Sequence, residues 1–269
     1  MATVTERIGQ IGNAGRYIKM SDFEQVAFTD DVTLNASENI SGPLMGTAVE
    51  YLTRLLVSGQ SVGKVFSDVT LRGALIAEYL YRKSNGKCGV KDASKILIKL
   101  LEGVKDFKDD NAIANVCRAV TFDAYYRNPI SAMESSSYEA VNPDSKTIQN
   151  IRTLTRRSVS FFEKYGPVTS CGFTFESSGY TETVDKGDGD FLTADGLWDM
   201  KVYRSRLLSK HALQVLMYWI MGQHSGQEIF KNIKKIGIYN PRMNVAYILE
   251  VSKIRPEIIR AVEDDVICY

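Results

Sequence analysis

Gly187-Asp-Gly-Asp-Phe-Leu-Thr-Ala-Asp-Gly-Leu-Trp-Asp-Met-Lys201 is the stretch that decides the fold of this sequence. Its centre, Asp195-Gly196, is a strong signal for a two-residue hairpin turn. If these two residues form the loop, Asp190 faces Lys201 across the hairpin and Asp199 lies beside them. A three-residue loop would shift this register by one. Because side chains two positions apart share a face of a strand, Asp190, Asp199 and Lys201 are predicted to gather on one face.

The other residues of the stretch are sorted by the same geometry. Phe191 and Trp198 fall on the opposite face, where they can be buried. Asp188 shares the face of Asp190 but is expected further from Lys201, and Asp195 belongs to the turn.

Two carboxylates and an ammonium group on one sheet face have two interpretations. A hard cation such as Mg²⁺ takes carboxylate oxygens together with waters and substrate phosphate oxygens, and it lowers the pKa of an attacking water. An adjacent lysine can orient that water or assist its deprotonation. The alternative is an exposed hairpin with an ion pair between Asp190 and Lys201, which would stabilise by roughly 0–1 kcal/mol.

Apolar periodicity divides the rest of the chain into a helical first half and a second half of strands and helices. Residues 1–43 are polar and mixed, and form an N-terminal arm in which residues 23–34 include a strand or stay loose. A loop at Asn128-Pro129 and residues 131–137 is the best candidate boundary. Helices are predicted at residues 44–56, 65–81, 95–101, 111–126, 145–164, 209–221 and 254–266, and strands at 168–175, 180–184, 190–193, 197–203, 235–239 and 244–251.

Bulk composition excludes several classes of protein. The chain has 269 residues, a formal charge of +1, 44% hydrophobic and 24% charged residues, which is ordinary for a globular protein and unlike a histone-like binder. Its four cysteines and two histidines have neither zinc-site nor nucleophilic-triad spacing. No signal peptide or membrane-length apolar run is found, so a cytoplasmic protein without a membrane partner is expected. Local basic clusters occur, such as Arg152, Arg156 and Arg157.

Asp190 followed by Asp199-x-Lys201 resembles the PD-(D/E)xK nuclease superfamily, whose short form is an Asp on one strand and Asp/Glu-x-Lys on the next. Further matches resemble its RecB-like and CRISPR-adaptation exonuclease branch. Gly187-Asp-Gly-Asp190 is similar to the G-x-x-D of that branch, and Leu197–Val202 has its apolar-flanked D-x-K. Gln214 and Tyr218, which share one face of the following helix, resemble its Q-x-x-x-Y motif.

The resemblance leaves the third acidic ligand open between two residues. The branch carries an upstream G-x-x-x-H on a helix, and Gly46-Thr-Ala-Val-Glu50 has that spacing with Glu in place of His. Many members of the superfamily use a Glu from the first helix, which favours Glu50. Glu163 competes because it lies just before the predicted sheet.

The resemblance implies an α/β (α+β) fold with a central mixed β-sheet flanked by helices, a restriction-endonuclease-like core. Residues 146–269 would form that core, and residues 44–145 a mainly helical region that contributes its first helix. Asp190, Asp199, Glu50 and the Met200 carbonyl would bind Mg²⁺ or Mn²⁺. Lys201 would position or activate water, and Gln214 and Tyr218 would steady the site or touch the nucleic-acid backbone.

The expected function is therefore a metal-dependent deoxyribonuclease, exo- or endonuclease, that leaves a 5′-phosphate. DNA is the expected partner, RNA is not excluded, a homo-oligomer is compatible with the sequence, and no iron–sulfur cluster is expected. One alternative is a catalytically degenerate nuclease fold that binds nucleic acid or protein. Another is a structural assembly subunit in which the charged hairpin is incidental.

Overall fold

The computed structural model describes residues 2–134, 137–176 and 178–269, without the side chain of residue 134. The chain forms two compact units. Unit 1 combines the two ends of the chain, Met1–Asp30 and Ser160–Tyr269, and unit 2 is the contiguous segment Asp31–Val159. The first 30 residues therefore belong to the unit that contains the sheet.

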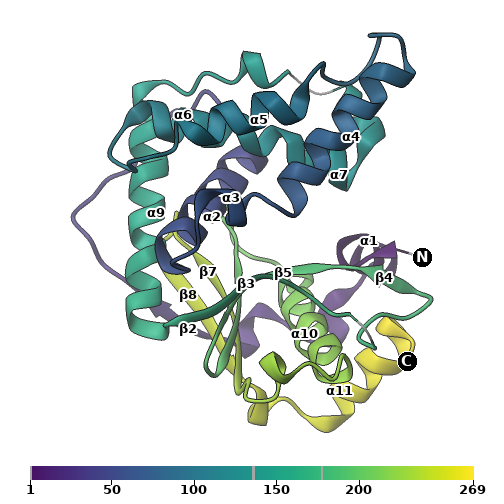
Figure 1. Cartoon of the computed structure of the whole chain (residues 1–269). Helices are drawn as coiled ribbons and strands as arrows, with labels where there is room; N and C mark the ends of the chain where they lie inside the picture. Colours follow the sequence, from purple (N-terminus) through teal and green to yellow (C-terminus); the bar gives the residue numbers. More distant parts are fainter. Residues whose placement is uncertain (1, 135–136, 177) are drawn as a thin grey trace. The chain divides into compact units, whose positions relative to one another are not determined.

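Unit 1 is built on a mixed six-stranded sheet of order β2-β8-β7-β6-β5-β3 (Figure 1). Neighbours are antiparallel except β6 and β7, which are parallel. This confirms the α/β class with a mixed sheet flanked by helices. The strands are β2 (Glu24–Ala27), β3 (Val168–Thr174), β5 (Asp188–Thr193), β6 (Gly196–Met200), β7 (Lys235–Asn240) and β8 (Val245–Glu250), and β1 (Ala2–Thr3) pairs separately with β4 (Val184–Lys186).

The N-terminal segment is more ordered than a polar arm. Its strand β2 pairs with β8 from Glu24↔Ile248 to Ala27↔Val245, so of the two alternatives for residues 23–34, a strand or a loose segment, the strand is observed. Helix α1 (Val4–Ile11) begins at Thr3, whose hydroxyl accepts a hydrogen bond from the Glu6 N–H. Residues 24–27 are mostly exposed and join the sheet at its edge through backbone hydrogen bonds.

The register of the β5–β6 hairpin differs from the predicted one by two residues. The observed pairs are Phe191↔Trp198 and Leu192↔Leu197, so the loop is Ala194-Asp195 and Gly196 begins β6. Gly196 belongs in the strand because the Trp198 indole lies where a β-carbon at this position would be. The indole Nε1–H donates to the Thr193 hydroxyl at 3.1 Å, which closes the hairpin. A register shift of two residues leaves every side chain on the same face of the sheet. Phe191 and Trp198 are therefore buried as predicted.

Helices cover both faces of this sheet. Helix α10 (Ser209–His224) packs Leu213, Leu216 and Met217 into a core that also contains Leu192 and Leu197. The last turns of α9 (Ser145–Tyr165) cover the opposite face. There, the ring of Phe161 stacks on Tyr239 at 4.3 Å, and meets Trp198 edge-on at 5.0 Å, while Phe162 packs on Phe191 at 4.7 Å. Helix α11 (Pro256–Val262) follows β8.

Unit 2 is helical, as the periodicity of the first half predicts. Ser41 caps α2 through its hydroxyl, and Asp144 caps α9 by accepting the Thr147 N–H at 2.7 Å. The loop predicted around residues 128–137 is instead helical over α8, because Pro129 fits the first turn of a helix; Ser135 and Ser136 lie outside the described residues. The helices are α2 (Gly42–Val57), α3 (Val62–Val65), α4 (Val69–Lys83), α5 (Ala93–Glu102), α6 (Asp110–Ala119), α7 (Asp123–Arg127), α8 (Pro129–Glu134) and the first part of α9.

A buried carboxylate ties three helical segments of unit 2 together. Asp123 is 4% exposed and accepts hydrogen bonds from the Thr70 hydroxyl at 2.6 Å and the Tyr51 hydroxyl at 2.8 Å. Burial raises the pKa of Asp123 against the opposing effect of these two donors. The interaction is internal to the helical unit and serves its packing.

Candidate functional site

The predicted acidic residues lie where β5 and β6 run side by side in unit 1. Continuing the observed register places Asp190 opposite Asp199, and the expected pairing of Asp190 with Lys201 is therefore wrong. The error arose because the loop precedes Gly196, which the Trp198 indole forces into the strand. The shared face of Asp190 and Asp199 is nevertheless the face covered by α10.

Asp190 is fixed by the backbone of the neighbouring strand. Its Oδ2 accepts a hydrogen bond from the Met200 N–H at 2.7 Å. The charge-assisted bond orients the carboxylate toward the end of β6. Asp190 therefore contacts the backbone N–H of Met200, the residue whose carbonyl was predicted to be a metal ligand.

Asp199 and Lys201 form a largely buried ion pair. The Lys201 Nζ donates to Asp199 Oδ1 at 3.0 Å and lies 2.9 Å from Oδ2, where the hydrogen-bond geometry is not met. The Asp199 side chain is 2% exposed and that of Lys201 18%. The two groups stand two residues apart at the end of β6, which places both on the α10 face.

Burial and neighbouring charges shift the pKa values of Asp199 and Lys201 in opposing ways. Burial raises the pKa of Asp199 to about 7, with a further upward push from the Asp190 and Asp188 carboxylates, although Lys201 lowers it. Burial also disfavours the charged form of Lys201, but the carboxylates of Asp199 and Asp190 outweigh it and raise the pKa of the ammonium above its ordinary value. A permanent ammonium therefore stands beside a carboxylate that titrates near neutrality.

The two motif residues of α10 are joined to each other and face the acids. The Gln214 Nε2 donates to the Tyr218 hydroxyl at 2.8 Å. Burial raises the pKa of Tyr218 well above its usual range, and the negative charges of Asp199, Asp188 and Asp190 raise it further. The structure therefore brings the Q-x-x-x-Y pair to the same face of the sheet as the carboxylates.

His211, on the first turn of α10, was not singled out from the sequence. Its Nδ1 accepts the Leu208 N–H at 2.9 Å, so the ring proton of the neutral form is on Nε2. The side chain is 5% exposed and meets the Tyr203 ring edge-on at 5.2 Å. Burial and the charges of Lys201 and Lys210 lower its pKa to about 4. A single isolated histidine carries no sequence signal, and only the fold brings it beside Lys201.

The candidates for a third acidic ligand lie elsewhere in the fold. Glu50 is on α2 of unit 2, where it forms an ion pair with Arg54 one turn later. Glu163 is exposed near the end of α9, whose neighbouring Phe161 and Phe162 cover the other sheet face. Glu50 as a ligand stays a prediction. Asp195 lies in the hairpin loop, as predicted, and pairs with Lys235 at 3.0 Å.

The carboxylates of Asp190 and Asp199 fit a cation that keeps part of its water shell. Within residues 2–134, 137–176 and 178–269, no three His, Cys, Asp or Glu side chains are grouped so that they could hold a metal ion. Two carboxylates do converge, and Asp199 Oδ2 is a buried oxygen without a hydrogen bond. Mg²⁺ is typically held by one or two carboxylates, waters and substrate phosphate oxygens, which fits this pair.

Comparisons of the chain with protein families, with curated proteins and with solved structures found no match. Among the described residues, no helix is long and apolar enough to cross a membrane.

Proposed function

We propose that this protein is a Mg²⁺- or Mn²⁺-dependent nuclease that hydrolyses phosphodiester bonds in DNA. The observation that carries the proposal is the grouping of Asp190, Asp199 and Lys201 at the end of the β5–β6 hairpin, on the face where Gln214 and Tyr218 lie. A buried carboxylate with a raised pKa beside a charged lysine is typical of functional sites. A buried ion pair is, by contrast, weak evidence for a purely stabilising role.

The order of the elements supports a restriction-endonuclease-like core. Helix α9 precedes the antiparallel strands β3, β5 and β6, and α10 then leads to β7, which is parallel to β6. The acids stand on the second and third strands of this series and the Q-x-x-x-Y pair on the helix that follows. Sequence motif and topology thus agree on the same positions.

The protein's own residues have distinct roles in this proposal. Asp190 and Asp199, with the Met200 carbonyl, would hold the cation. Lys201 carries a fixed positive charge that can orient a water and balance the negative charge that develops on the phosphate. Gln214 and Tyr218 fix each other and present a polar edge to the backbone of the substrate. When bound, Mg²⁺ or Mn²⁺ would polarise the phosphate and lower the pKa of the attacking water.

The test is cleavage of linear and circular DNA, single- and double-stranded, with Mn²⁺, Mg²⁺ or EDTA. Wild type is expected to cut with either metal and to be silent in EDTA. Asp199→Ala and Lys201→Ala are expected to lose cleavage by at least about 100-fold. Lys231→Ala removes an exposed lysine that pairs with Glu228 and should cut like wild type.

Thermal unfolding of each variant shows whether lost cleavage reflects lost folding. Metal-dependent cleavage that persists in both Asp199→Ala and Lys201→Ala would exclude this site. Cleavage of circular substrates would identify an endonuclease, and cleavage of linear substrates alone an exonuclease.

A second candidate function is a nucleic-acid- or protein-binding module that has lost catalysis. Two observations favour it: Lys201 already neutralises Asp199, and the part of the chain that the structure describes has no group of three His, Cys, Asp or Glu side chains that could hold a metal ion. Saturable DNA binding without turnover at any Mg²⁺ or Mn²⁺ concentration would select this function over the nuclease.

A further inference from the structure

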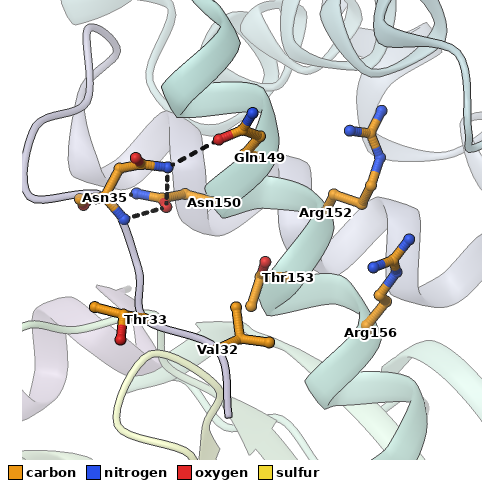
Figure 2. Close-up of a pocket in the computed structure, with 8 residues that line it drawn as sticks. All are labelled: Val32, Thr33, Asn35, Gln149, Asn150, Arg152, Thr153 and Arg156. Atoms are coloured by element: carbon orange, nitrogen blue, oxygen red, sulfur yellow. Dashed lines mark hydrogen bonds between the residues drawn. The ribbon is translucent and has the colours of Figure 1, made fainter. Parts of the chain in front are cut away.

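A second polar site lies in unit 2, remote in sequence from the hairpin acids. A hollow of about 360 Å³ separates residues 32–35, a segment without helix or strand, from the middle of α9 (Figure 2). Asn35 and Asn150 stand at one end of it, and Arg152 and Arg156 lie one turn apart along the helix. The volume is within the range of small-molecule sites.

The wall formed by residues 32–35 is held firmly to α9. Asn150 Oδ1 accepts the Asn35 N–H at 2.8 Å, and Asn150 Nδ2 donates to the Asn35 carbonyl at 3.0 Å. Asn35 Nδ2 also donates to Gln149 Oε1 at 3.3 Å (Figure 2). Further along, Arg157 donates to the Val32 carbonyl at 2.8 Å. The hollow is therefore preformed, and a ligand would not have to order it.

The lining is positively charged and has no acidic side chain. Arg152 is anchored on one side by Asp110 at 2.6 Å and by the Lys108 carbonyl at 3.1 Å. Its buried Nε has no hydrogen-bond partner. Within residues 2–134, 137–176 and 178–269, Arg156 has neither an ion pair nor a hydrogen bond. Like charges four residues apart on a helix repel each other, and a bound anion removes that repulsion.

Neutral donors complete the lining. Thr33 and Thr153 line the hollow, one from each of its two walls. Arginine guanidinium groups with nearby hydroxyls are the usual donors to phosphate oxygens. A metal cation would require the opposite charge in the lining.

We propose that this hollow binds a phosphate ester, with Arg156 as the principal contact and Thr33 and Thr153 as supporting polar residues. The phosphate belongs either to a free nucleotide or to the backbone of a nucleic acid, since both present the same oxygens. The site is separate from the proposed nuclease site, and it stands whether or not the protein cleaves DNA.

The test measures binding to the full-length chain in EDTA, so that cleavage does not interfere. The probes are inorganic phosphate, a nucleoside monophosphate and a short fluorescent single-stranded oligonucleotide. Arg156→Gln is expected to weaken binding of at least one probe about fivefold or more. Arg82→Gln, which removes an exposed arginine from another helix of unit 2, is the matched control and should stay within about twofold.

The probes separate the two sources of the phosphate. An Arg156-dependent affinity for the monophosphate identifies a free nucleotide as the ligand. An Arg156-dependent affinity for the oligonucleotide alone identifies a nucleic-acid backbone, and Arg156→Gln should then reduce the slope of log affinity against log salt by about 1. The proposal fails if no probe binds saturably, or if Arg82→Gln weakens binding as much as Arg156→Gln.

Discussion

The carboxylate of Asp190 accepts the backbone N–H of Met200 across the β5–β6 hairpin at 2.7 Å. A residue proposed as a metal ligand therefore also closes the strand pair beyond its last regular pairing at Phe191↔Trp198. Two substitutions of Asp190 can separate its effect on stability from its effect on cleavage.

Asp190→Ala is expected to reduce the free energy of unfolding by about 1–3 kcal/mol, because a charge-assisted hydrogen bond is lost. Asp190→Asn keeps an acceptor for the Met200 N–H and should retain most of the stability, yet lose metal-dependent cleavage. Urea unfolding in EDTA measures the first effect and the cleavage assay the second. Equal stability losses in the two variants would show that the bond to Met200 contributes little.

The Asp199 carboxyl makes stability fall as the pH rises. Its pKa in the folded protein is raised to about 7 from an ordinary value of 3.8, so the folded state binds this proton more tightly than the unfolded state. The stabilising contribution is complete below pH 3.8 and is lost as the pH rises through about 7. Wild type should therefore lose stability relative to Asp199→Asn between pH 4 and pH 7. Urea unfolding of both proteins in EDTA at several pH values gives the difference, and a difference independent of pH would contradict the raised pKa.

His211 has the opposite pH dependence. Its folded-state pKa is lowered to about 4 from 6.5, so the unfolded state binds the proton more tightly. The neutral ring stabilises fully above pH 6.5, and that contribution is lost as the pH falls toward 4. Wild type should lose on the order of 2 kcal/mol relative to His211→Asn over this range. Asparagine keeps an acceptor near the Leu208 N–H without titrating, and parallel curves for the two proteins would exclude the assignment.

Gly189 allows an aromatic ring to lie flat on β5. A β-carbon at this position would overlap the ring of Phe173, which is 4% exposed. Gly189→Ala is therefore expected to destabilise by about 1–3 kcal/mol, and Phe173→Leu in the same chain should recover part of the loss. The control is Gly9→Ala on α1, where no atom lies within 4 Å of the added carbon. This exposed helical substitution should be neutral or stabilise by about 0.5–1 kcal/mol in thermal unfolding.

Local patterns predicted β3, β5, β6, β7, β8 and α10 of unit 1 and the side chains of each face of the hairpin. They did not predict α1, and the strand expected at residues 180–184 is instead β4 at Val184–Lys186. Period-two alternation assigned Asp190 and Asp199 to one face and Phe191 and Trp198 to the other, and helical spacing joined Gln214 to Tyr218. The exact register could not be predicted from the Asp195-Gly196 signal, because it depends on the packing of the Trp198 indole over Gly196.

The long-range contacts of the fold could not be predicted from the sequence. Nothing in residues 24–27 indicates that they pair with residues 245–248, since each segment satisfies its own local preferences. The contact of Asp190 with Met200 and the burial of His211 beside Lys201 likewise arise only when the sheet and α10 are assembled. These are tertiary properties, and local propensity does not encode them.

The pairing of β2 with β8 also has a consequence for the order of events during synthesis. Unit 2 is contiguous, so all of its helices have been made once residue 159 has left the ribosome. The partner of β2 is made only when residue 250 is reached, and until then the backbone groups of residues 24–27 have no strand to bind. Residues 24–27 are thus made before the helical unit but pair only after it has been made, so that unit has time to fold first.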